Sequence, residues 1–236
     1  MKLFLKKIRK HLSRCVFPMT RLCASLLSLF GSLLGKVYKK LWRYSDLASY
    51  EHMFDYLSGI KNFYWLERGI NGLKPLPIGA KVLDLGCGDG IFSGIFYSTR
   101  AKDVEAVDWD PKIITLAKKN YQRPNVVFRQ ADITKISLQK KYDAVYLFAV
   151  IEHFTVAEGQ GLVKKISLAL NEGGYFMGST PLFSEKGGHN VEHQNEFSTE
   201  QEVKDFVSMA FSHIETWISF WPHGRRECYF LCRLPK

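Results

Sequence analysis

A buried strand that runs directly into a glycine-rich turn constrains this chain more than any other feature. Residues 82–90 read Val-Leu-Asp-Leu-Gly-Cys-Gly-Asp-Gly, an apolar run with one carboxylate, followed by Gly86, Gly88 and Gly90 at alternate positions. A glycine has no Cβ, so each of these positions lets the backbone approach a ligand closely. The pattern therefore predicts a nucleotide-cofactor site where a strand meets a helix.

The spacing and charge of this turn argue against a dinucleotide. Ile91 stands where the dinucleotide pattern places its third glycine, and Gly94 comes too late. A pyrophosphate favours bare backbone N–H groups, whereas the carboxylates of Asp84 and Asp89 would repel it. We therefore expect a cationic or neutral ligand.

Two further strands are predicted to end at an acid. Residues 104–107 form an apolar run that ends at Asp108, about 20 residues after the glycine turn, which is where a βαβ unit places a ribose-binding acid. Residues 125–130 lead in the same way into Asp132. In a parallel sheet the carboxyl ends of the strands meet at one edge, and we expect the ligand there.

The second half of the chain continues the alternation of strands and helices. Residues 142–148 are nearly all apolar and lead into the segment Ala-Val-Ile-Glu-His-Phe at 149–154. Residues 170–177 supply a helix end, a glycine turn and a fifth strand. This alternation predicts a parallel sheet with helices on both faces. Two β-like runs, His213 to Phe220 and Glu227 to Leu234, follow as a hairpin.

In their order, these features resemble the class I S-adenosylmethionine-dependent methyltransferases. The resemblance implies an α/β fold, with a Rossmann-like, doubly wound, mostly parallel seven-stranded sheet whose last strand is antiparallel. It implies S-adenosyl-L-methionine as the cofactor, with Asp108 holding the ribose hydroxyls and Asp132 accepting from the adenine amino group. The cofactor contacts that it implies are Asp84, Gly86, Cys87, Gly88, Gly90, Asp108, Trp109, Asp132, Ile133 and Phe148.

The positive charge of the chain is confined to its N-terminal part. The 236 residues carry a formal net charge of +10, yet residues 1–45 hold 11 Lys and Arg and no Asp or Glu, so residues 46–236 are close to neutral. A length of this order allows one α/β domain and an extension. We expect a helical extension at 1–45 and a catalytic domain at 46–236. We expect no nucleic-acid partner, because the net charge of this domain is close to zero.

The extension has the pattern of an amphipathic helix. Leu22, Leu26, Leu29 and Leu33 share one stripe, and basic residues stand on both sides of the apolar stretch. That stretch is too short to span a bilayer, for which about 20 residues are needed. We expect it to bind an anionic membrane surface, on the cytoplasmic side. A helix packed on protein and a cleaved signal peptide are the alternatives. Five cysteines without metal-binding spacing agree with a reducing, cytoplasmic compartment.

Histidines near the end of the fourth strand and after the fifth are the candidate catalytic residues. The loop from Pro181 to Phe197 contains His189 and His193, and His153 stands in the 149–154 segment. A hydroxyl acceptor needs a general base with a pKa near the working pH, for which histidine is suited. Ser198, with Gln201 three residues later, has the pattern of the next helix N-cap.

Glu152, His153, Glu192 and His193 are residue types that bind divalent cations, and together they could form a metal site. Phe148 and Ile151 occupy positions where further carboxylates would strengthen such a site. We therefore expect no metal.

The resemblance favours oxygen chemistry on a small or lipid-linked molecule. The segment 149–152 replaces the Asp/Asn-Pro-Pro-Tyr signature of DNA and RNA amino-methylation. The acceptors expected are a small molecule, a glycolipid, a lipid-linked saccharide or a quinone-like molecule at the cytoplasmic membrane face. The alternatives are a soluble natural-product or protein methyltransferase with a partner-binding extension, and a non-catalytic scaffold that keeps the fold.

Overall fold

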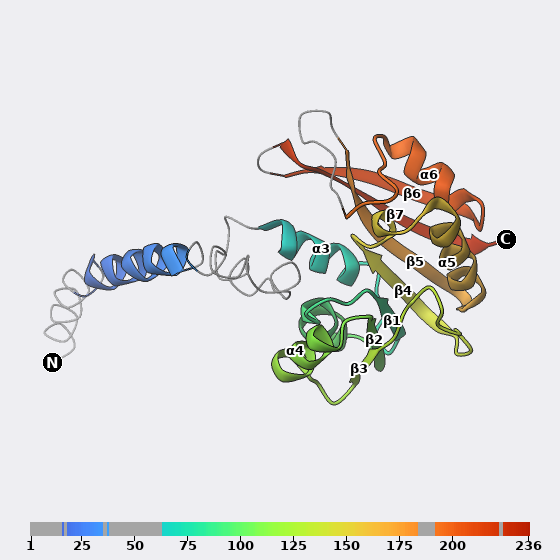
Figure 1. The fold of residues 1–236 in the computed structure, drawn as a ribbon. Coiled ribbons are helices and arrows are strands. Elements are labelled where there is room, and N and C mark those ends of the chain that lie inside the picture. The colour runs from blue at the N-terminus through green and yellow to red at the C-terminus, as the bar shows by residue number, and fades with distance from the viewer. Residues whose placement is uncertain (1–15, 17, 35–36, 38–62, 184–191, 222–223) are drawn as a thin grey trace, which may run out of the picture. The chain divides into compact units, whose positions relative to one another are not determined.

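The computed structural model describes residues 16, 18–34, 37, 63–183, 192–221 and 224–236 (Figure 1). The chain divides into two compact units, Met1–Trp65 and Leu66–Lys236. The domain boundary predicted after residue 45 lies outside the described residues, so it stays a prediction.

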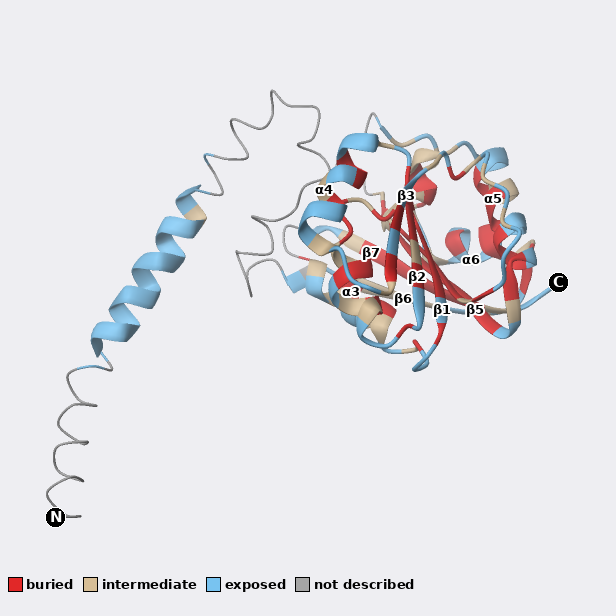
Figure 2. Cartoon of the chain, turned by 90° about the horizontal axis from the view of Figure 1, so that it is seen from below, coloured by how far each residue is buried: buried red, intermediate tan, exposed pale blue. Residues whose placement is uncertain are grey.

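In the N-terminal unit, residues 18–34 are helical. The predicted apolar stripe lies on this helix, and Leu22, Leu26, Leu29 and Leu33 are each more than half exposed. Figure 2 shows the helix coloured almost entirely as exposed. No described helix is both long enough and apolar enough to cross a membrane.

The second unit is built on a seven-stranded sheet in the order β3-β2-β1-β4-β5-β7-β6. Strands β1 to β5 run parallel where they pair, and β7 is antiparallel to both β5 and β6. This confirms the predicted fold, including the antiparallel last strand. The strands are β1 (Lys81–Leu85), β2 (Asp103–Asp108), β3 (Val126–Gln130), β4 (Tyr142–Phe148), β5 (Leu170–Leu182), β6 (Phe211–Phe220) and β7 (Arg226–Pro235).

Helices cover both faces of the sheet because alternate strand residues point to opposite sides. Val82 of β1 belongs to one buried cluster and Leu83 to the other. The first cluster includes Ile114 of α4 (Pro111–Tyr121), while the second includes Leu162 of α5 (Val156–Leu168) and Val203 of α6 (Glu200–Ser208). The inner strands are accordingly buried, as Figure 2 shows.

The order of the strands determines where a ligand can sit. The chain leaves β1 for β2 on one side and later places β4 on the other side of β1. Open α/β sheets bind ligands at such a switch point, outside the carboxyl ends of the strands. The glycine-rich turn begins at Gly86, directly after β1 ends at Leu85.

Candidate cofactor and acceptor site

Three glycines shape the turn, two because a side chain would clash with neighbouring residues and one because it borders open space. Gly86, Gly88 and Gly90 all have positive φ, at 69°, 53° and 82°. A Cβ at Gly86 would lie 2.5 Å from Val150 Cγ2, and one at Gly90 would lie 2.6 Å from the Phe128 ring. A Cβ at Gly88 would meet nothing within 4 Å. Gly88 therefore borders open space that a ligand can fill, which is the cradle that the sequence predicts.

Asp108 holds this turn from the end of β2. Its Oδ2 accepts a hydrogen bond from the Gly88 N–H at 2.9 Å, and its Oδ1 accepts from the Asp110 N–H at 3.1 Å. The carboxyl is nearly buried, and burial raises its pKa. The acid that the sequence assigns to the ribose thus lies directly at the glycine turn.

Asp84 adds a second buried carboxyl beside Asp108. The hydroxyl of Ser93 donates to Asp84 Oδ2 at 2.6 Å, from the wide π-helical turn η2 (Phe92–Phe96). Burial, together with the charge of Asp108, raises the pKa of Asp84 to about 7, although the hydrogen bond from Ser93 opposes this shift. Two buried acids at one turn favour a cationic ligand over a phosphate, and a sulfonium-bearing amino acid fits this environment.

The remaining predicted cofactor contacts differ in their surroundings. Cys87 and Phe148 are buried in the cluster on the α4 face, and Ile133 is buried in the cluster on the other face. Burial raises the pKa of the Cys87 thiol, so this side chain is unreactive and contributes only packing. Trp109 is exposed, and its carbonyl accepts from the Gln130 side chain at 3.1 Å. Its indole is therefore available at the carboxyl edge of β2.

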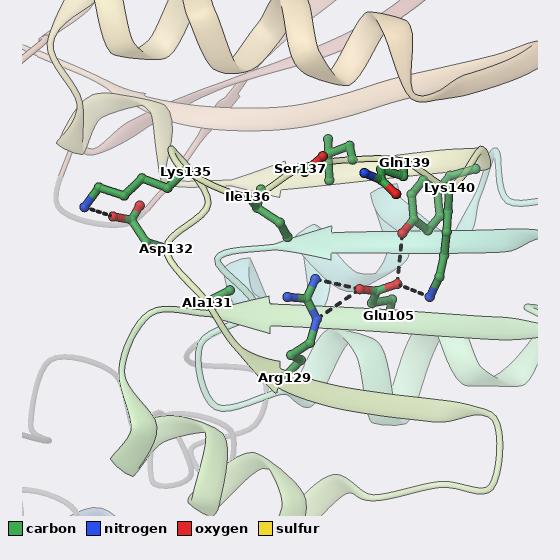
Figure 3. A pocket seen from close by; sticks show the side chains of 11 residues that line it. Glu105, Arg129, Ala131, Asp132, Lys135, Ile136, Ser137, Gln139 and Lys140 are labelled. Carbon is green, nitrogen blue, oxygen red and sulfur yellow. Dashed lines mark hydrogen bonds and ion pairs between the residues drawn. The ribbon is translucent and has the colours of Figure 1, made fainter.

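Asp132 lies at one end of a pocket of about 600 Å³. Its carboxylate pairs with Lys135 at 2.8 Å and accepts from the Thr134 hydroxyl at 2.6 Å, and these donors lower its pKa to about 2. Figure 3 shows that the pocket lies along the segment between β3 and β4. Its lining includes Glu105, which accepts from Arg129, Lys140 and Tyr142.

The structure brings two of the three predicted histidines together. The rings of His153 and His193 are perpendicular, with centroids 5.2 Å apart. His153 belongs to the turn η4 (Ile151–His153), and the carbonyl of Glu152 in the same turn accepts from the backbone N–H groups of Gln194 and Asn195 at 2.8 and 3.1 Å. His189 lies outside the described residues.

The surroundings of His193 suit a general base. Burial lowers its pKa, and so does His153, and both favour the neutral ring, which is the form that can accept a proton. Its Nδ1 lies 3.5 Å from Glu196 Oε1. The same segment reaches the glycine turn, because Val150 is the residue that a Cβ at Gly86 would strike.

A buried acid adjoins the two histidines. Glu152 is almost fully buried, and burial raises its pKa to about 8. One ligand atom each from Glu152, His153 and His193 lies within 4.8 Å of the others, so these three could share a divalent cation. The sequence predicts no metal, and this expectation stays a prediction.

Sequence reasoning missed a buried polar network at the ends of β5, β6 and β7. Glu227 is fully buried and accepts from Arg68 of α3 (Phe63–Leu73) and from Ser179. Thr180 donates to Glu152 at 3.2 Å, which joins this network to the histidine pair. The signal was the charged run at 225–227, which opens an otherwise apolar strand.

Removing the Asp108 carboxylate should weaken cofactor binding while the fold stays intact. In Asp108→Ala we expect a loss of about 1.5–3 kcal/mol for each charge-assisted hydrogen bond that is lost. Titration calorimetry with S-adenosyl-L-homocysteine measures this loss. Asp103→Ala, at the exposed start of the same strand, is the matched control. An unchanged affinity in Asp108→Ala would remove Asp108 from the site.

Comparisons with known proteins agree with this geometry. Residues 82–174 match a family model described as a methyltransferase domain. The chain is 40% identical over 81 residues to ribosomal protein L11 methyltransferase of Dictyoglomus thermophilum, covering 34% of this chain and 27% of that protein. It is 28% identical over 121 residues to ubiquinone biosynthesis O-methyltransferase of Acinetobacter baumannii, covering 49% and 48%. The chain thus spans less than half the length of these relatives.

Among solved structures, the fold is similar to that of N-methyltransferase NodS from Bradyrhizobium japonicum WM9. The TM-score is 0.62 at 15% identity, and the match covers 74% of this chain and 98% of NodS. The NodS complex with S-adenosyl-L-homocysteine gives a TM-score of 0.60 at 14% identity, with 82% and 92% covered. At such low identity these similarities concern the fold alone.

Proposed function

Because the chain carries a class I S-adenosylmethionine-dependent methyltransferase domain, we propose that it methylates a hydroxyl group of a small or lipid-linked acceptor. The observation that carries this proposal is the pairing of His153 and His193 beside the glycine turn. A largely buried histidine, whose burial favours the neutral ring, supplies the base that a hydroxyl acceptor needs. The acceptors in view are a glycolipid, a lipid-linked saccharide or a quinone-like molecule.

The roles of the residues follow from their positions. S-adenosyl-L-methionine, when bound, supplies an activated methyl group. The glycine turn and Asp108 would hold its nucleoside part, and Asp84 would face its cationic part. His193 would take the proton of the acceptor hydroxyl on its ring, and Glu196 would stabilise the imidazolium that results. The remaining task of the protein is to align the acceptor and exclude water.

Methyl transfer into a lysate of the source organism tests this function. Radiolabelled methyl from S-adenosyl-L-methionine is followed into organic-soluble, macromolecular and small polar fractions. We expect label in the organic fraction. Label only in protein or in the aqueous fractions would favour the soluble natural-product or protein methyltransferase. Absence of S-adenosyl-L-homocysteine binding in a calorimetric titration would favour the non-catalytic scaffold.

We further propose that residues 1–45 bind an anionic membrane surface. The leucine stripe on the helix at 18–34 is exposed, and basic residues flank it in the sequence. Apolar burial and charge attraction would then act together and place the domain at the cytoplasmic membrane face. This position would bring a lipid-linked acceptor to the site. A helix that packs on a partner protein is the alternative.

Sedimentation with vesicles containing phosphatidylserine tests the extension. We expect the full chain to sediment and a chain without residues 1–45 to remain in solution. In the full chain, Leu26→Glu with Leu29→Glu should abolish sedimentation because both changes place a charge in the apolar stripe. Ser25→Glu with Ser28→Glu adds the same charge at two serines outside the leucine stripe and should reduce sedimentation less. Equal effects of the two pairs, or unchanged sedimentation after truncation, would exclude the stripe as the anchor.

A further inference from the structure

In the buried carboxylate of Glu227, one oxygen accepts several hydrogen bonds and the other accepts none from the described residues. Nε and Nη2 of Arg68 donate to Oε1 at 3.0 and 2.6 Å, and the Ser179 hydroxyl donates to the same oxygen at 2.6 Å. Oε2 accepts no hydrogen bond from the described residues, although Glu227 has no exposed surface. A buried polar atom without a hydrogen bond destabilises the fold and is uncommon, so we expect Oε2 to accept a hydrogen bond from a ligand.

Arg225 lies beside this open oxygen. Its Nη2 is 3.8 Å from Glu227 Oε2, which is within ion-pair range but beyond a hydrogen bond. The guanidinium is 5.0 Å from the centre of the Trp221 ring, and half of the Arg225 side chain is exposed. Within the described part of the chain its guanidinium makes no hydrogen bond. A donor and an acceptor that make no hydrogen bond within the described residues therefore lie next to each other.

This pair belongs to the same end of the sheet as the histidines. Glu227 pairs in register with Pro181 of β5, and the neighbouring Thr180 donates to Glu152. The positive charge of Arg225 also helps to lower the pKa of His193. A ligand group held between Arg225 and Glu227 would thus lie near the proposed base.

We propose that Arg225 and Glu227 bind a second hydroxyl of the acceptor, which makes the acceptor a polyhydroxylated headgroup, such as that of a saccharide. This inference rests on the proposed methyltransferase function. A hydroxyl can accept from Arg225 while it donates to Glu227 Oε2. The half-exposed side chain of Arg225 has to move to admit it, because Oε2 is closed to solvent in this form.

Other ligand groups satisfy only one member of the pair. An ammonium group would donate to Glu227 but would be repelled by the charge of Arg225. A carboxylate or phosphodiester would accept from Arg225 but has no proton to donate to Oε2. A quinone carbonyl accepts and cannot donate. Arg68 already balances the charge of Glu227 through its two hydrogen bonds to Oε1, so Oε2 lacks a proton donor and not a counter-charge, and a hydroxyl is the group that fits both residues.

The test varies Arg225 in the full chain and uses one chloroform–methanol extract of the source-cell membranes as the acceptor. In Arg225→Met we expect the half-saturating extract concentration to rise about 10- to 100-fold, with kcat and the KM for S-adenosyl-L-methionine unchanged, because ground-state binding is lost. Arg225→Lys should recover part of the loss. Arg233→Met is the matched control, because Arg233 of β7 forms an exposed ion pair with Glu215 of the neighbouring β6.

Product analysis completes the test. After acid methanolysis of the labelled lipid, we expect the label in a methylated sugar. An unchanged half-saturating concentration in Arg225→Met, or label in a product without a polyol, would overturn the inference. Wild-type protein that fails to bind S-adenosyl-L-homocysteine would instead overturn the proposed function. Glu227→Gln is a second test variant, provided that its melting temperature shows it to be folded. It too should raise the half-saturating extract concentration without changing kcat or the KM for S-adenosyl-L-methionine.

Discussion

Gly88→Leu is expected to abolish cofactor binding while leaving the domain folded. The Cβ position at Gly88 borders open space, so the new side chain displaces no protein atom and instead fills the cradle. We expect the affinity for S-adenosyl-L-homocysteine to fall at least about 100-fold, or roughly 3 kcal/mol. Titration calorimetry measures the affinity, and thermal unfolding measures the cost of a side chain at positive φ.

Gly79→Leu is the matched control for this substitution. Gly79 also has positive φ, at 81°, and a Cβ there likewise meets nothing within 4 Å, but it stands in the turn before β1. The Gly79→Leu variant should lose about as much stability as Gly88→Leu while it keeps its affinity for S-adenosyl-L-homocysteine. Wild-type affinity in Gly88→Leu, or an equal loss in Gly79→Leu, would contradict the assignment of the cradle.

His193→Gln should lower kcat by about 10²- to 10⁴-fold, which is the usual contribution of a positioned general base. Glutamine keeps hydrogen-bonding capacity but cannot accept the proton. The affinity for S-adenosyl-L-homocysteine should stay within about threefold, because His193 lies outside the glycine turn. His153→Gln should have a smaller effect, since its Nδ1 is already engaged by the Glu192 carbonyl at 3.1 Å.

His213→Gln is the control for the histidine series, because His213 is exposed and pairs only with Glu215 among the described residues. Each variant is assayed with and without a chelator. Loss of wild-type activity on chelation, restored by a divalent cation, would assign Glu152, His153 and His193 to a metal instead of a base. Full activity in His193→Gln would remove it from catalysis.

Local patterns in the sequence were sufficient for most of the sheet and for the cofactor side of the site. Alternating and continuous apolar runs indicate strands, and the carboxyl ends of parallel strands converge at one edge. Asp84, the glycine turn and Asp108 are therefore predictable as neighbours, and the structure joins Gly88 to Asp108 by a hydrogen bond.

Boundaries were less certain where two patterns compete. Ser198 with Gln201 predicted the N-cap of α6, but this prediction was wrong by one residue. Thr199 is the N-cap, and its hydroxyl accepts from the Glu202 N–H at 3.2 Å. The Ser-x-x-Gln and Thr-x-x-Glu frames overlap, and a glutamate in the first turn interacts favourably with the helix dipole.

The sequence by itself determined the order of strands and helices, the glycine turn and the acids at the strand ends, because these depend on spacing along the chain. Only the tertiary structure decided which distant side chains meet. Arg68 and Glu227 are 159 residues apart, and His193 reaches His153 through a backbone contact with Glu152. Such contacts depend on strand register and on how a loop docks, so no local pattern encodes them.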